Sequence, residues 1–492
     1  MKDLKQKTIR GGLARLGAQA ANFLLRMGSL MVLARLLGPK DYGLVGMVTA
    51  FTGVLSLFRD FGLSSATVQH TTVTDDQVST LFWINMLFGA LLMLLSMAMA
   101  PAIAAFYHEP RLLAVTAVLA VGFLFNAAGV QHGALLQREM RFTALAVINT
   151  VSLVASTAIA IAGAKGGYGY WALVAMTVTF PLVVSIGYWL ATGWIPGMPR
   201  RRAGVRSLMR FGTTLTLNGL VAYVAYNCEK VLLGRFWGVD AIGIYGRAYQ
   251  LINIPTENLN TAVGEVAFAA LSRTQDDPNR LKSYFLKGYS LVLALTIPIT
   301  VVCALFADDV VSVFLGPKWK DVAAIFRLLA PTILIFAIIN PLGWLMYSLG
   351  LVARGLKIAL VFAPLIITGC IIGLPYGPKG VAFAYSTVMI LWLLPHIAWC
   401  VHGTVISFWD VLLTGGRPLA TGIAAGGLAF AVRLSILHQM SALPRLILES
   451  ATVFIPFFGI LLFVAGQKSF YLDLLRGLRR PSSIKDEGLV SA

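Results

Sequence analysis

Long apolar runs alternate with short polar segments along the whole chain. A helix needs about 20 apolar residues to cross a bilayer, and fourteen runs reach that scale between turns such as GPKDYG and PYGPKG. A barrel is disfavoured because the runs are longer and more continuously apolar than barrel strands. The expected transmembrane helices cover residues 11–37, 42–69, 78–106, 112–136, 141–164, 168–195, 207–236, 240–270, 283–306, 322–350, 354–373, 379–402, 417–437 and 445–466.

The distribution of Lys and Arg predicts the orientation of these helices. With the N-terminus in the cytoplasm and fourteen crossings, 21 basic residues fall on cytoplasmic segments and only seven on external ones. Cytoplasmic segments of membrane proteins collect Lys and Arg, so we expect both termini in the cytoplasm. The external loops are all short, which leaves no room for an extramembrane catalytic domain.

The chain resembles itself after a shift of 200 residues. Arg10, Gly12, Leu33, Arg35, Gly38, Gly43 and Gly46 then fall on Arg210, Gly212, Leu233, Arg235, Gly238, Gly243 and Gly246. Parallel repeats of this kind are typical of secondary transporters, whose substrate site lies between the repeats. We expect an N-terminal six-helix lobe over 1–200, a C-terminal six-helix lobe over 201–404, two further helices over 405–466 and a basic cytoplasmic tail over 467–492.

The composition agrees with an all-α polytopic membrane protein. Of the 492 residues, 58% are hydrophobic and 12% are charged, against a usual charged share of about 25%. This excludes an ordinary soluble enzyme, a disordered protein and a disulfide scaffold. The net charge of +18 does not indicate a nucleic-acid partner, because the positive-inside bias accounts for much of it. The four cysteines, in apolar runs, read as core residues.

Of the 39 basic residues, 28 are assigned to the cytoplasmic and external segments, and the remaining eleven lie within the expected helices. Six are close enough to helix ends to extend to the interface, namely Arg15, Arg35, Arg210, Arg235, Lys287 and Arg433. Five lie deeper, namely Arg26, Arg59, Lys230, Arg247 and Arg327. A charge at the bilayer centre costs roughly 2.5–3.5 kcal/mol and normally faces a cavity or a partner. The five deep cations predict a cavity that binds an anion such as a phosphate or pyrophosphate.

Polar side chains recur beside these cations at helical spacing, which predicts the polar face of the cavity. The candidates are Gln19 and Asn22 in the first helix, Asn227 in the seventh, and Tyr249 and Asn253 in the eighth. The alternative interpretation is that such residues hydrogen-bond one helix to another. That alternative explains single Ser, Thr and Asn residues well and the arginines poorly.

Four acidic residues are assigned to the spans, namely Asp60, Glu229, Glu257 and Glu265. Each is a candidate for coupling transport to H⁺ or Na⁺, or else a counter-ion for a nearby arginine. The sequence contains no P-loop, no HExxH or GxSxG motif and no cysteine or histidine spacing typical of a metal site. We therefore expect no catalytic residue, no bound metal and no cofactor other than the coupling ion.

Several ordered stretches carry a family resemblance: LARLLGPKDYGLVG, DFGLSSATVQ, GYWALV, PTENLNTAVGEVAFAALSRTQDD, FLGPKW and YGPKGVAFAYS. They resemble the polysaccharide transporters of the MOP superfamily, most closely the Wzx-type flippases. The resemblance implies transfer of an undecaprenyl-pyrophosphate-linked oligosaccharide from the cytoplasmic to the periplasmic leaflet of the bacterial inner membrane. Alternating access driven by an ion gradient is implied as well.

The resemblance also implies partners and leaves alternatives open. The implied partners are the lipid-linked oligosaccharide, membrane lipids, a polysaccharide polymerase and a chain-length regulator, in O-antigen, exopolysaccharide or capsule biosynthesis. A lipid II flippase would share the cationic cavity. A MATE-like multidrug exporter would need an acidic cavity for organic cations. A membrane glycan polymerase or ligase would usually carry a large external loop.

Overall fold

The computed structural model describes residues 22–59, 64, 67–68, 73–200, 220, 223–224, 226–436, 440–464 and 466. Within these residues every regular element is a helix and no strand occurs. The chain divides into two compact units that are interleaved along the sequence. Unit 1 comprises Met1–Gln250, Val311–Ile325 and Ala359–Val388, and unit 2 comprises Leu251–Val310, Phe326–Ile358 and Met389–Ala492. The lobe boundaries expected from the repeat stay a prediction.

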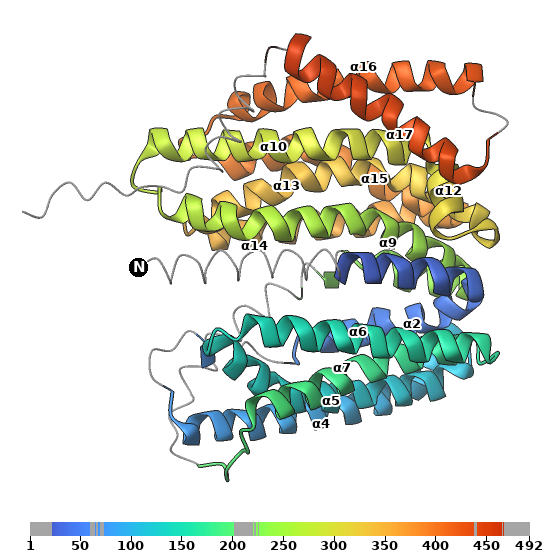
Figure 1. Cartoon of the computed structure of the whole chain (residues 1–492), viewed down its shortest axis with the longest axis vertical. Helices are drawn as coiled ribbons and strands as arrows, with labels where there is room; N and C mark the ends of the chain where they lie inside the picture. Colours follow the sequence, from blue (N-terminus) through green and yellow to red (C-terminus); the bar gives the residue numbers. More distant parts are fainter. Residues whose placement is uncertain are drawn as a thin grey trace, which may run out of the picture. The chain divides into compact units, whose positions relative to one another are not determined.

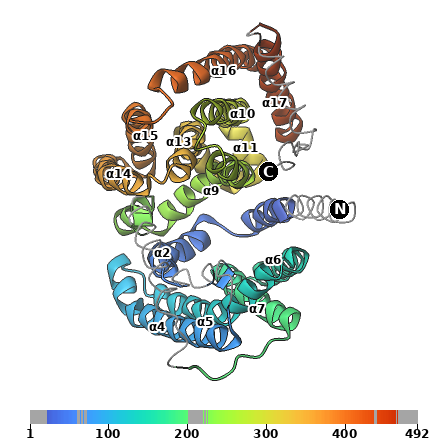
Figure 2. The ribbon, with the colours of Figure 1, turned by 90° about the vertical axis from the view of Figure 1, so that its left-hand side faces the viewer.

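Unit 1 is built mainly from its N-terminal helices. After a helix over residues 22–36 come α2 (Pro39–Ser56), α4 (Asp75–Tyr107), α5 (Arg111–Arg138), α6 (Phe142–Lys165) and α7 (Tyr170–Thr192). Helix α5 packs against α4 and α7, and α7 packs against α6, so these four helices lie side by side (Figures 1 and 2). Helix α2 contacts α4, α5 and α7.

Local sequence signals fix where these helices begin. Helix α2 starts with Pro39, whose missing N–H is not needed in a first turn, and the Asp41 carboxylate accepts from the Gly38 N–H at 2.9 Å. Helix α4 begins with a capping box, in which Thr74 Oγ1 accepts from the Gln77 N–H at 3.3 Å and Gln77 Oε1 accepts from the Thr74 N–H at 3.0 Å. The polar turns of the sequence thus mark real helix starts.

Helix α9 (Cys228–Ser272) contains the break expected between the seventh and eighth spans. Its backbone leaves the helical region at Gly238, with φ 79° and ψ −167°, a conformation that glycine adopts readily. The repeat-equivalent Gly38 is also non-helical, with φ −104° and ψ 174°, and separates the helix over 22–36 from α2. The break therefore falls at the same place in both repeats.

The two repeats cross within unit 1 at a pair of glycines. A Cβ on Gly43 would overlap the carbonyl oxygen of Val239, and one on Gly243 would overlap the carbonyl oxygen of Pro39. Residues 39 and 239, like 43 and 243, are 200 positions apart, so the two contacts are equivalent. The internal repeat read from the sequence thus appears as a pseudo-symmetric backbone contact.

The second half of the chain completes unit 1 with a part made of two segments, Val311–Ile325 and Ala359–Val388. It includes parts of α11 (Ala307–Phe314), α12 (Lys320–Leu329), α14 (Val352–Gly373) and α15 (Gly377–Val401), with the 3₁₀ turns η1 (Pro317–Trp319) and η2 (Leu374–Tyr376). The buried Trp319 donates through Nε1 to the carbonyl of Ala34 at 2.7 Å. The FLGPKW stretch is therefore part of the unit 1 core.

Unit 2 is organised around α10 (Pro278–Leu305). This helix contacts α13 (Pro331–Ser348), α16 (Phe408–Ile436) and α17 (Ala442–Gly459), the last continued by a π-helical turn, η3 (Ile460–Val464). Figure 2 shows α10 beside α13 and below α16. The core of the unit includes Phe285, Tyr289, Ile297 and Phe457.

Two expected segments differ from the observed helices. The span over 322–350 is divided, because α12 ends at Leu329 and α13 starts at Pro331, whose ring disfavours a continuous helix. The external segment over 307–321 is not an irregular loop but contains α11 and η1. Both differences arise from prolines and short amphipathic turns. An average of hydropathy over a long window does not resolve such features.

The outer surfaces of the helices are apolar. Leu190, Leu391 and Ile423 are each more than two-thirds exposed, which a soluble monomer rarely tolerates in contiguous patches. Among the described residues, eight helical segments are long and apolar enough to cross a membrane, one of them joining α14 and α15 over Val352–Val401. The chain is a multi-pass membrane protein, and the count of fourteen stays a prediction.

Candidate functional site

Three of the predicted cavity residues meet in unit 1 near the start of α9. Lys230 Nζ donates to Asn227 Oδ1 at 2.7 Å, and it lies 5.0 Å from the ring centroid of Tyr249. Asn227 is itself held by a hydrogen bond from its Nδ2 to the carbonyl of Tyr223 at 2.9 Å. The lysine is half-buried, and its positive charge is stabilised there by an amide oxygen and by an aromatic face.

A buried polar cluster adjoins this lysine. Glu229 is fully buried, and neither carboxylate oxygen has a hydrogen-bond partner among the described residues. The hydroxyls of Tyr245 and Tyr385 are likewise buried without a partner, and both tyrosines lie within electrostatic reach of Glu229. Unsatisfied buried polar groups are rare and often mark a proton, water or ion site. We define Glu229, Tyr245, Tyr249 and Tyr385 as the tyrosine cluster.

Arg247 forms a cation–π contact that joins α9 to α2. Its guanidinium lies 3.4 Å from the ring centroid of Tyr42 and donates to the amide oxygen of Gln250. Tyr42 packs edge-on against Trp319, with ring centroids 5.4 Å apart. Arg247 is half-buried, and its two partners, the Tyr42 ring and the Gln250 amide, are neutral. The arginine therefore keeps its positive charge inside unit 1.

The residues on the polar face of the first helix differ in environment, since one packs against a neighbouring helix and another is exposed. Asn22 Oδ1 accepts from Thr150 Oγ1 of α6 at 3.1 Å, so this residue fits the packing alternative. Arg26, one turn further along, is exposed. Arg59 is also exposed and lies in the bend after α2. Gln19 and Asp60 lie outside the described residues.

The other predicted residues belong to unit 2. Arg327, in the last turn of α12, pairs with Asp308 at 2.6 Å, so its charge is neutralised within its own unit. Asn253 is half-buried and Glu257 is exposed on the second half of α9. Glu265 lies on the same helix, and its side chain is outside the described part. The structure therefore separates Arg327 from the unit that holds Lys230 and Arg247.

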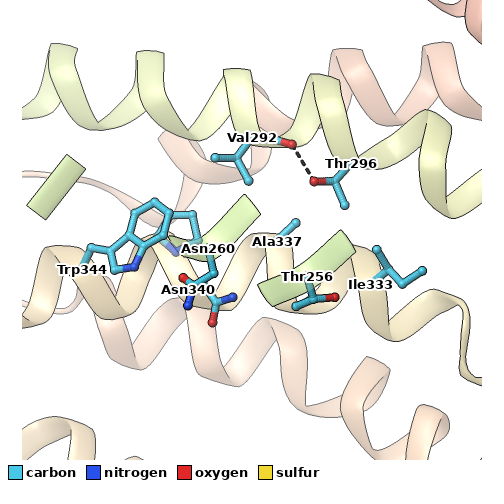
Figure 3. Close-up of a pocket in the computed structure, with 9 residues that line it drawn as sticks. Thr256, Asn260, Val292, Thr296, Ile333, Ala337, Asn340 and Trp344 are labelled. Atoms are coloured by element: carbon cyan, nitrogen blue, oxygen red, sulfur yellow. Dashed lines mark hydrogen bonds between the residues drawn. The ribbon is translucent and has the colours of Figure 1, made fainter. Parts of the chain in front are cut away.

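A small polar pocket in unit 2 lies between α9, α10 and α13 (Figure 3). The Asn260 and Asn340 amides lie together there, and Thr296 Oγ1 donates to the carbonyl of Val292 at 2.7 Å. Its volume of about 10 Å³ suits one water molecule. The pocket is too small for a sugar, and the residues around it pack the three helices together.

An apolar groove of about 490 Å³ opens on unit 2 between α10, α13 and α16. Ile297, Val301, Leu334 and Phe430 contribute to its walls. Gly422 allows α16 to approach α10, because a Cβ there would overlap Ile297. We call this surface the apolar groove. Its lining suits a hydrocarbon chain and offers almost no polar group.

Sequence reasoning missed one buried acid within the last expected span. Glu449 of α17 is fully buried and lies 3.7 Å from Arg433 Nε, and Asp309 of α11 is 1% exposed. Arg433, which we expect at the membrane interface, keeps 28% of its side chain exposed and also approaches Asp308 at 4.0 Å. The available signal was a lone glutamate in an otherwise apolar run.

The apolar helices define a multi-pass membrane protein, and unit 1 holds two half-buried cations, Lys230 and Arg247. The model of the family described as "Polysaccharide biosynthesis protein" matches residues 32–324, and the chain belongs to that family. It is 26% identical over 401 residues to the lipopolysaccharide biosynthesis protein WzxC of Escherichia coli, covering 79% of this chain and 80% of the relative. It is 27% identical over 419 residues to the teichuronic acid biosynthesis protein TuaB of Bacillus subtilis, covering 80% and 82%.

Solved structures share the fold at low sequence identity. The lipid II flippase MurJ in an inward closed conformation superposes with a TM-score of 0.73 at 14% identity, covering 95% of this chain and all of that one. An inward-facing multidrug resistance MATE transporter of the MOP superfamily gives 0.63 at 13% identity, covering 77% and 93%. The fold expected from the sequence resemblance is confirmed, and these likenesses do not separate a lipid from a drug as substrate.

Proposed function

We propose that this protein flips an undecaprenyl-pyrophosphate-linked oligosaccharide repeat unit from the cytoplasmic to the periplasmic leaflet. It acts in the bacterial inner membrane, with both termini in the cytoplasm, by alternating access. The flipped unit then serves a polysaccharide polymerase and a chain-length regulator in the synthesis of an exopolysaccharide, O-antigen or capsule. Family membership and two relatives named for polysaccharide biosynthesis support this proposal.

The observation that carries the proposal is the environment of Arg247. A half-buried guanidinium held by a tyrosine ring and a neutral amide keeps a full positive charge in a low-dielectric setting. Such a charge attracts an anion, and a planar guanidinium is well shaped for a phosphate. Lys230, held by Asn227 and the Tyr249 ring, adds a second cation in the same unit. An organic cation would be repelled from both.

The apolar groove supports a lipid-linked substrate. A polyprenyl chain is a flexible hydrocarbon, and a groove lined by aliphatic and aromatic side chains matches it chemically. We assign the pyrophosphate to Arg247 and Lys230 of unit 1, and the groove gives unit 2 a surface that suits hydrocarbon.

Glu229 is our choice for the coupling residue among the four candidate acids. It is fully buried with no hydrogen-bond partner among the described residues, and it lies beside the unpartnered hydroxyls of Tyr245 and Tyr385. Binding of a proton or a cation would satisfy these atoms. Glu257 is exposed and has no comparable need for a ligand.

A binding measurement tests the anion site directly. Purified protein in lipid nanodiscs is titrated with a short-chain prenyl pyrophosphate oligosaccharide, and the dissociation constant is followed by calorimetry. We expect Arg247→Gln to weaken binding by about tenfold or more, since a lost charge-assisted contact costs roughly 1.5–3 kcal/mol. Arg111→Gln, at an exposed ion pair, is the matched control. Unchanged affinity in Arg247→Gln, or tight binding of an organic cation instead, would refute the proposal.

A further inference from the structure

Six charged side chains of unit 2 gather where α10, α16 and α17 meet the start of α11 and the end of α12. The acids are Asp308 and Asp309 of α11 and Glu449 of α17, and the bases are Arg327 of α12, Arg433 of α16 and Arg445 of α17. Helix α10 contributes a backbone carbonyl, that of Leu305, which accepts from Arg433. By the expected topology this cluster is near the external membrane surface.

The six charged groups differ in how well each is paired with a group of opposite charge. Asp308 is more than half exposed and pairs with Arg327 at 2.6 Å. Asp309 is 1% exposed, and its Oδ1 accepts from Arg445 Nε at 2.8 Å. Glu449 is fully buried, and its nearest cation, Arg433 Nε, is 3.7 Å away, too far for a hydrogen bond. Incomplete pairing is therefore confined to the two buried acids, Asp309 and Glu449.

Three oxygens of those acids lack a hydrogen-bond partner among the described residues. They are both carboxylate oxygens of Glu449 and Oδ2 of Asp309. The two carboxyl groups lie close enough to interact with each other. Two ionised carboxylates have only acceptor atoms and cannot hydrogen-bond to each other. One proton on either group supplies the missing donor and also removes one of the two like charges.

We infer that Asp309 and Glu449 form a proton-binding carboxyl pair, a site separate from the cations and the tyrosine cluster of unit 1. The ligand is a proton rather than a metal cation, because Arg445 occupies one Asp309 oxygen and Arg433 lies beside Glu449. Guanidinium groups on both sides leave too few oxygens for a metal, and no group of three acidic, histidine or cysteine ligands occurs in the described part of the chain. With the proton bound, α17 is tied to α11.

Infrared spectroscopy tests this site without reference to transport. The full-length protein carrying Glu229→Gln, which removes the buried acid of the tyrosine cluster, is exchanged in bilayers between acidic, neutral and alkaline buffers, and the C=O stretching band of protonated carboxylic acid is recorded. We expect a band that persists at neutral pH, shifts in D₂O and disappears in alkaline buffer. Both Glu449→Gln and Asp309→Asn should abolish it, because an amide N–H replaces the shared proton. Glu257→Gln, at an exposed glutamate, should leave it intact.

Several outcomes would overturn the inference. A Glu229→Gln spectrum with no such band at neutral pH would do so, as would a band that survives when Glu449→Gln and when Asp309→Asn is added to Glu229→Gln. Loss of the band on adding Na⁺ at constant pH would show a cation site instead. Thermal unfolding gives a second readout: Glu229→Gln should lose stability as pH rises and the pair ionises, whereas the double variant with Glu449→Gln should lose none of its stability over that range. An equal loss in both would refute the pair.

Discussion

Gly43 and Gly243 occupy equivalent positions in the two repeats, and each meets the backbone that precedes the other. Gly43 lies against the carbonyl of Val239, and Gly243 lies against the carbonyl of Pro39. No side chain larger than hydrogen fits at either contact. The reciprocal pairing means that α2 and the segment of α9 that follows Gly238 cross on an approximate two-fold axis within unit 1.

Adding a methyl group at either glycine should destabilise the protein. Overpacked contacts typically cost about 1–3 kcal/mol, and here the obstructing atom is a backbone oxygen, which yields little. Gly43→Ala and Gly243→Ala should each lower the thermal unfolding temperature in detergent. Gly246→Ala is the matched control, because a Cβ there meets nothing within 4 Å, and it should gain roughly 0.5–1 kcal/mol of helix stability. Equal effects at all three positions would contradict the crossing.

The stacking of Arg247 on Tyr42 should depend on the ring and not on the hydroxyl. Tyr42→Phe keeps the aromatic face and should leave stability near that of the wild type. Tyr42→Leu removes the face, and we expect a loss of about 0.5–2 kcal/mol, the range of cation–π contacts. Denaturant or thermal unfolding of the two variants measures the difference. If Tyr42→Phe is as damaging as Tyr42→Leu, the hydroxyl and not the cation–π contact carries the interaction.

Glu229 should control the response of transport to an ion gradient. Glu229→Gln keeps the size of the side chain and cannot ionise, so we expect lipid exchange between leaflets to continue but to lose its acceleration by an imposed gradient. Glu257→Gln, at an exposed site on the same helix, should keep that acceleration. The measurement is the ratio of flipping rates with and without the gradient. An unchanged ratio in Glu229→Gln would remove this residue from the coupling step.

The turn between α4 and α5 should contribute a small pH-dependent stability. The hydrogen bond from Arg111 lowers the pKa of Glu109 below its ordinary value of 4.5, and Arg111 Nε lies 2.7 Å from Glu109 Oε1. A lowered pKa stabilises the folded state above the ordinary pKa, and this stability is lost as pH falls through the lowered value. Because Arg111 is half exposed, we expect at most about 1 kcal/mol.

Comparing unfolding of the wild type and Glu109→Gln across acidic pH isolates this contribution. The difference between them should vanish at the lowest pH, where Glu109 is protonated in both states of the wild type. A difference that grows as pH falls would contradict the assigned sign.

Hydropathy predicted the helices that are long and uniformly apolar. The run over 78–106 became α4 (Asp75–Tyr107), and the run over 112–136 became α5 (Arg111–Arg138), because the burial of apolar surface in a membrane dominates there. The repeat predicted the break at Gly238. Mean hydropathy did not predict the division at Pro331, since one proline changes the backbone without changing the apolar character of the run.

The sequence predicted which residues belong to the candidate site, but it did not predict which of them contact each other. Lys230, Asn227 and Tyr249 share a cluster, as helical spacing indicated, although Tyr249 comes from a different part of α9. The pairing of Arg327 with Asp308 depends on how α11 and α12 fold back, which no local pattern encodes. Asp309 and Glu449 are 140 residues apart in sequence, so their juxtaposition follows only from tertiary packing.

Flipping of a lipid-linked oligosaccharide by the purified protein is the central claim. The protein is reconstituted in liposomes that contain a pyrophosphate-linked polyprenyl oligosaccharide, and the fraction of headgroups accessible from outside is followed with and without a proton gradient. The account predicts protein-dependent redistribution that is lost in Arg26→Ala and in Arg247→Gln and retained in Arg111→Gln. No redistribution, together with efflux of a cationic dye from the same liposomes, would contradict it and would assign Arg26 and Arg247 a structural role.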